Sequence, residues 1–285
     1  MKGSWICIAF LNAFVAFGQN TSEDFQATFT RHLKENNVEA LQQTVREWRT
    51  TLPDDAEGFV ASFNYYLLNA SGSDILEEQN NGANASALHN LEQKFVDSAL
   101  VVLQEGLKLH PMRLDMHMGY IYTLGQNQRW EEFTPRILSL LDRAKATNYK
   151  GWLWSGNRPV GDEAKVFIIE SIADYQMMLY ATYSDERLLD MRKIAVNILQ
   201  VQEGHIDQLN FMALSYSEMG DYAQAYKWIR KAIEISPDIS EVVTNYDRIL
   251  KAAFSKKEAK KELNRFRKNA EKPLYEVLTR IYYSL

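Results

Sequence analysis

The histidines are the first residues to test for metal binding or acid–base chemistry, because imidazole titrates near neutral pH and is a common metal ligand. The five histidines are His32, His89, His110, His117 and His205. His110 and His117, with Asp115 between them, are the nearest approach to a ligand cluster. Pro111 separates His110 from the others, and residues two apart on a helix do not face each other. The spacing therefore predicts neither a metal site nor a bound cofactor.

Acidic pairs are the next candidates, since two carboxyl groups can serve as general acid and base. The pairs are Glu77-Glu78, Glu131-Glu132 and Asp162-Glu163. Such pairs more often form solvated faces or complement the positive end of a helix dipole. The sequence also lacks a phosphate loop, a dinucleotide turn, a zinc-protease helix and a nucleophile elbow. We expect no catalytic residues and no enzyme; the enzyme-class alternative is a helical hydrolase that uses Asp162 or Glu163 near Trp154.

Residues 151–158 are the least ordinary local feature, with two tryptophans separated by one residue. In an extended chain Trp152 and Trp154 would lie on one side, and Asn157 and Arg158 could supply hydrogen bonds around an aromatic platform. Such a platform would suit a sugar ring or a peptide side chain. The alternative, which we favour, is that both indoles plug a gap between two halves of a helical structure.

Helices must position these residues, because apolar side chains recur at three- and four-residue spacing over most of the chain. One such stripe comprises Leu91, Phe95, Ala99, Val102, Leu103, Gly106 and Leu107. No alternating pattern of useful length predicts a strand, and six prolines and 13 glycines are few for 285 residues. The sequence therefore predicts an all-α fold, interrupted by loop insertions at about residues 69–85 and 144–161.

Residues 1–18 differ from the rest and have the layout of a secretory signal peptide. Lys2 precedes an apolar stretch of about 13 residues, too short to span a bilayer, and small residues lead to Gly18. We expect cleavage after Gly18, a periplasmic or secreted protein, and no stable membrane insertion afterwards. Cleavage would remove Cys7, the only cysteine, so that no disulfide or thiolate site could form. The net charge of −5 argues against a nucleic-acid partner.

Residues 206–238 carry the strongest repeat signal. Small residues (Ala213, Ala225, Ala232) allow two helices to approach closely, Gly220-Asp221 makes a tight turn, and Pro237 ends the second helix. The large residues Leu209, Met212, Tyr216, Tyr222 and Ile229 fill the space beside them. This spacing resembles the tetratricopeptide repeat, whose period is about 34 residues. Weaker copies extend over most of residues 21–285, and one of them places His117 where a large apolar residue is usual.

The resemblance implies an α-solenoid of antiparallel helix pairs that forms a right-handed superhelix, with residues 273–285 as the C-terminal capping helix. Members of the family bind partners in the concave groove lined by the first helix of each pair. The repeat template places six residues of this chain on that face: Asn64, Met118, Tyr122, Asn210, Leu214 and Ser217. The groove lacks the basic clamp that some members use for peptide carboxylates.

The chain is also similar to envelope tetratricopeptide repeat proteins of Bacteroidetes. These features predict a non-catalytic scaffold or adaptor that binds a protein or peptide, and the alternative is a glycan-binding protein that uses Trp152 and Trp154.

Overall fold

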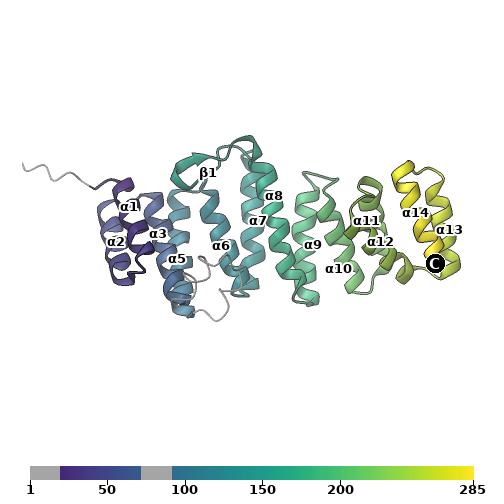
Figure 1. Ribbon diagram of the computed structural model, residues 1–285, viewed down its shortest axis with the longest axis horizontal. Helices are drawn as coiled ribbons and strands as arrows, with labels where there is room; N and C mark the ends of the chain where they lie inside the picture. The colour runs from purple at the N-terminus through teal and green to yellow at the C-terminus, as the bar shows by residue number, and fades with distance from the viewer. Residues whose placement is uncertain (1–19, 72–91) are drawn as a thin grey trace, which may run out of the picture.

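The computed structural model describes residues 20–71 and 92–285. Helices are the dominant element of these residues, and they follow one another along the long axis of the molecule (Figure 1). Their bounds are α1 (Ser22–Lys34), α2 (Val38–Thr51), α3 (Ala56–Ser71), α5 (Gln93–Leu109), α6 (Leu114–Gln126), α7 (Trp130–Ala146), α8 (Ala164–Tyr180), α9 (Asp185–Leu199), α10 (Ile206–Glu218), α11 (Tyr222–Ile235), α12 (Ser240–Ala253), α13 (Lys256–Arg267) and α14 (Lys272–Ser284). The expected all-α solenoid is therefore confirmed.

The helices form successive pairs, each joined by a short turn where the connection is described. Helix α1 packs on α2, α3 on α5, α6 on α7, α8 on α9 and α10 on α11, and α13 contacts both α12 and α14. First helices of neighbouring pairs also touch, because α6 contacts α8, α8 contacts α10 and α10 contacts α12. The first helices consequently form one layer that runs along the solenoid.

Local chemistry sets several helix boundaries. Thr21 accepts a hydrogen bond from the backbone N–H of Asp24, whose carboxylate accepts one from the Thr21 N–H, and Ser255 and Glu258 repeat this capping box before α13. Each box satisfies amide groups that the first helical turn leaves without partners. Gly220 has a φ of 81° in the turn between α10 and α11, a left-handed conformation that favours glycine.

Three clusters of buried residues lie along the solenoid. The first comprises residues of α1–α3, the second spans α3 to α10, and the third spans α10 to α14. Helix α10 joins the last two clusters, since Phe211 and Leu214 belong to one and Leu209 and Ala213 to the other. The small residues at 213, 225 and 232 are fully buried, as close approach of α10 and α11 requires.

The segment between α7 and α8 contains the two strands of the described residues, which the sequence does not predict. Strand β1 (Leu153–Trp154) pairs antiparallel with β2 (Arg158–Pro159), and the 3₁₀ turn η2 (Ser155–Asn157) joins them. A second 3₁₀ turn, η3 (Gly161–Glu163), leads into α8. The Leu153 N–H donates to the Met112 carbonyl at 2.9 Å, which attaches this hairpin to the start of α6.

The ends of two helices differ from the expected insertion boundaries. Helix α3 continues through Ser71, because the Asn69 side chain donates to the Tyr65 carbonyl at 2.8 Å and Ala70 packs in the core. Helix α7 continues through Ala146. The rest of the first insertion, the proposed signal peptide and its cleavage site lie outside the described residues. Among the helices that are described, none combines the length and apolar character needed to cross a bilayer.

Candidate functional site

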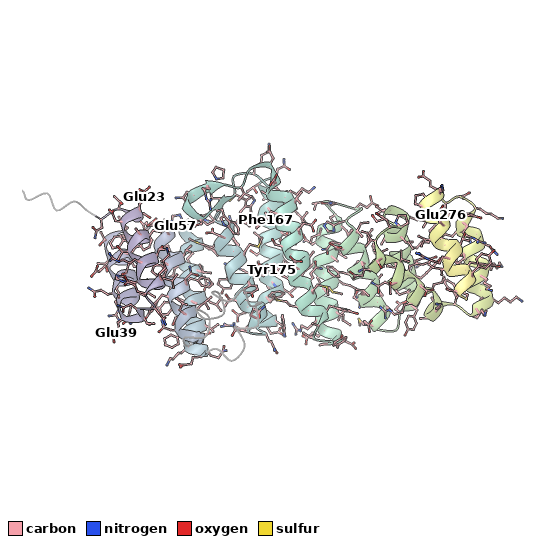
Figure 2. All side chains as sticks on the ribbon, viewed as in Figure 1. Glu23, Glu39, Glu57, Phe167, Tyr175 and Glu276 are labelled. Carbon is pink, nitrogen blue, oxygen red and sulfur yellow. The ribbon has the colours of Figure 1, made fainter. Side chains whose placement is uncertain are left out.

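Helix α8 contacts the first helices α6 and α10, and its sequence is rich in apolar residues. One stripe of α8 remains in solvent and carries Phe167, Glu170, Asp174 and Met177 at helical spacing. Phe167 and Met177 are 40% and 45% exposed, so both apolar side chains can be reached from solvent. We call this stripe, together with Asp207 at the start of α10, the first-helix face. Figure 2 shows Phe167 near the hairpin end of α8 and Tyr175 near the middle of the helix.

Most of the groove residues predicted from the repeat template are out of solvent. Met118, Asn210, Leu214 and Ser217 are buried, Tyr122 is half-buried and Asn64 is exposed on α3. The template treats each repeat separately, whereas contacts of α10 with both α8 and α12 cover its inward side. The four buried side chains therefore offer little surface to a partner.

Asn210 illustrates this burial, because both ends of its amide are engaged within the solenoid. Its Nδ2 donates to Glu241 Oε1 at 2.9 Å, and its Oδ1 accepts from Asn245 Nδ2 at 3.0 Å. Glu241 and Asn245 belong to α12, so the amide joins neighbouring first helices. Asn210 thus stabilises the stacking of two pairs.

Tyr122 connects α6 to the neighbouring first helix, α8. Its ring lies 6.3 Å from the ring of Tyr175 on α8, measured between centroids. The Tyr175 hydroxyl donates to the Met118 carbonyl at 3.4 Å, and burial raises the pKa of Tyr175 to about 12. The Tyr175 hydroxyl therefore remains protonated at neutral pH and acts as a donor between the two helices.

Three chemically active side chains from α8 and the start of α10 converge on the first-helix face. Suitable ligand atoms of Glu170, His205 and Asp207 all lie within 4.8 Å of one another. Asp207 is exposed as a residue, but partial desolvation of its carboxyl beside the packed helices raises the pKa of that group. The negative charges of Glu170 and Asp174 raise this pKa further, and His205 opposes these effects. Sequence reasoning missed this cluster, because its members come from different helix pairs and His205 has no neighbouring motif.

The tryptophan segment does not form an open platform. Trp152 is 1% exposed and its indole packs edge-on against His117, with ring centroids 5.7 Å apart. Trp154 is half-buried and packs edge-on against Phe167, with ring centroids 5.2 Å apart. The two indoles have different ring neighbours, and Trp152 lies just before β1, which begins at Leu153. The buried Trp152 ring cannot stack on a sugar.

The two polar residues of that segment also have partners within the chain. The Asn157 side-chain oxygen accepts from Arg113 at 3.4 Å, and the exposed Arg158 donates to the Ser155 carbonyl at 3.0 Å. Asp162 and Glu163, considered for a hydrolase, are exposed in η3. Asn157 and Arg158 thus stabilise the turn, and Asp162 and Glu163 face solvent beside it.

A buried ion network that the sequence does not predict anchors the hairpin. Arg113 is 1% exposed, and its Nη2 lies 2.8 Å from Glu57 Oε1 and 2.7 Å from Asp115 Oδ2. Glu57, labelled in Figure 2, lies at the start of α3 and also accepts from the Gly156 N–H at 2.7 Å. The network therefore connects α3, α6 and the hairpin.

The histidines near Asp115 are committed to separate partners. His110 Nε2 is 2.6 Å from the Asp54 carbonyl, and His117 Nε2 is 3.1 Å from the Pro111 carbonyl. Asp115 itself binds Arg113. His110 therefore links the end of α5 to the turn before α3, whereas Asp115 and His117 hold the segment at the start of α6.

No family model matches the sequence, and no curated protein matches it. The structure is similar to a crystal structure of a tetratricopeptide repeat protein from Parabacteroides merdae, with a TM-score of 0.43 and 10% sequence identity. The similarity covers 92% of this chain and 86% of the other.

Proposed function

We propose that this protein is a non-catalytic scaffold that binds a segment of another protein along the first-helix face. The observation that carries the proposal is the exposed stripe of α8, in which the apolar Phe167 and Met177 flank the carboxylates Glu170 and Asp174. Apolar side chains supply most of the binding energy in such contacts, and charges select the partner. The face therefore suits a segment with apolar anchors and basic residues.

The electrostatics of the chain favour a protein partner over a nucleic acid. The net charge is −5, and the three acidic residues of the first-helix face repel phosphates. Lysine or arginine side chains of a partner would instead be attracted, and added salt would weaken this attraction. A basic peptide is thus the expected ligand class.

A peptide library displayed on phage, selected against residues 19–285, tests the proposed face. The double change Phe167→Ala and Met177→Ala is expected to weaken the selected peptides at least about tenfold, since both anchors are lost. The matched control is Val101→Ala and Val196→Ala, because these valines are 53% and 46% exposed on second helices. Equal binding by the two double variants would assign the peptides to another surface.

We also propose that the chain is exported to the cell envelope, on the basis of its first 18 residues. Expression of the full chain in a Gram-negative bacterium is expected to yield a periplasmic protein that begins at Gln19. Mass spectrometry of the intact protein measures this start. An unprocessed chain in the cytoplasm would contradict export.

A further inference from the structure

His205 is a buried histidine with no hydrogen bond on either side of its ring. Its side chain is 5% exposed, and Nδ1 and Nε2 both lack a hydrogen-bond partner. Its backbone is fixed, because the N–H donates to the Gln202 carbonyl and the carbonyl accepts from the Leu209 N–H. Buried polar groups are rarely left unbonded in folded proteins, so this imidazole requires an explanation.

Two carboxylates face the His205 ring from the first-helix face. Glu170 Oε1 lies 3.4 Å from His205 Nε2, and the nearest ligand atoms of Glu170, His205 and Asp207 lie within 4.8 Å of one another. Two ligands of a tetrahedral zinc ion, each about 2.0–2.1 Å from the metal, are themselves about 3.3 Å apart. The Glu170–His205 distance therefore already matches one edge of a zinc site.

The other ligand atoms must come closer together than they lie now, and they belong to side chains that can change rotamer. Glu170 and Asp207 are exposed, so a rotamer change in either brings its oxygen toward the ring without disturbing the core. Asp174 lies one turn after Glu170 on α8, is exposed, and interacts electrostatically with Asp207.

We propose that Glu170, His205 and Asp207 bind a divalent zinc ion that links α8 to α10. The ligand set selects this class of metal, because imidazole nitrogen suits zinc, whereas calcium and magnesium prefer oxygen ligands alone. The ion would neutralise clustered carboxylates and engage the unbonded imidazole. It would also join two neighbouring helix pairs at a point where the first helices touch.

Calorimetric titration of tag-free residues 19–285 with zinc chloride, after treatment with a chelator, tests the site. We expect one zinc ion per chain and a Tm that rises by several degrees at roughly 100-fold excess over Kd. Calcium at the same concentrations is expected to leave Tm unchanged. Cobalt, used as a spectroscopic substitute, should give the visible absorption of a low-coordinate site.

Two variants locate the ion. Glu170→Gln changes one exposed oxygen to an amide and is expected to weaken zinc binding at least about tenfold, and His205→Gln should abolish it. The matched control Glu203→Gln removes an exposed carboxylate of the α9–α10 turn and should retain the affinity of the unmodified chain. Circular dichroism with chelator present establishes that the variants are folded.

The proposal is overturned if the unmodified chain binds no zinc. It is equally overturned if Glu170→Gln binds zinc as well as Glu203→Gln does, or if calcium binds more tightly than zinc. The two proposals share Glu170 and Asp207, but these measurements use the metal alone and the peptide test changes Phe167 and Met177, which are not zinc ligands, so failure of one proposal is distinguishable from failure of the other.

Discussion

His117 is a titratable side chain buried in α6. It is 6% exposed, its Nδ1 has no hydrogen bond, and its ring packs against Trp152. Burial lowers the pKa of His117 to about 4, and the positive charges of Arg136 and Arg143 act in the same direction, against the bond to the Pro111 carbonyl. The folded protein therefore holds this imidazole neutral.

This burial predicts a loss of stability in acid. Between pH 6.5 and about 4 the unfolded chain binds a proton at His117 that the folded chain does not, so the free energy of unfolding falls as the pH falls through this window. The contribution amounts to about 3 kcal/mol. The change His117→Phe should remove it, as measured by urea unfolding at pH 7 and pH 4. Identical pH dependence in the two proteins would show that His117 does not titrate in this range.

Arg113 is the second residue whose role depends on burial. The change Arg113→Met is expected to lower the free energy of unfolding by about 3–5 kcal/mol, because it leaves Glu57 and Asp115 without their buried cation. Arg248→Met removes an ion pair with Glu218 in which both side chains are at least 30% exposed, and should cost less than about 1 kcal/mol. Thermal unfolding measures the loss of stability in the two variants. An equal loss in both would contradict the anchoring role of Arg113.

At the scale of elements, close helix packing depends on single glycines. A Cβ added to Gly106 of α5 would lie 2.9 Å from Phe59 Cγ and 3.0 Å from Phe59 Cβ, on the paired helix α3. These atoms lie near the backbone of α3 and cannot move aside easily. This close approach of α3 and α5 therefore requires glycine at position 106.

Gly106→Ala is therefore expected to destabilise the protein by about 1–3 kcal/mol, despite the higher helix propensity of alanine. Gly119→Ala is the matched change within α6, where the new Cβ would meet Phe63 at an ordinary 3.4 Å. It should be neutral or stabilise by up to about 1 kcal/mol. Chemical denaturation measures both, and a stabilising Gly106→Ala would show that α3 and α5 can separate slightly.

At the scale of the whole molecule, stability is distributed along a row of helix pairs. Leu274, Leu278 and Ile281 of α14 cover the buried residues Leu263 and Phe266 of α13 within the C-terminal cluster. A chain that stops at residue 271 should expose this end of the solenoid. Hydrogen exchange is expected to accelerate in α12 and α13 and to stay unchanged in α5–α8, because repeat arrays couple mainly through nearest neighbours. Uniform acceleration would indicate one cooperative unit instead.

The all-α class and the helix pair within residues 206–238 follow from the sequence, because local periodicity and small residues at fixed spacing predict them. Which side chains stay exposed to solvent, and which come close together, depends on how the helix pairs stack. Asn210 and Leu214 satisfy the groove pattern, yet contacts of α10 with α8 and α12 remove them from solvent. Glu170 and His205 have no sequence pattern in common, yet stacking of their helix pairs brings them 3.4 Å apart. The periodicity of a sequence indicates on which side of its own helix a residue lies. Whether that residue is buried, and which residues of other helices lie near it, depends on the orientation of the neighbouring helix pair.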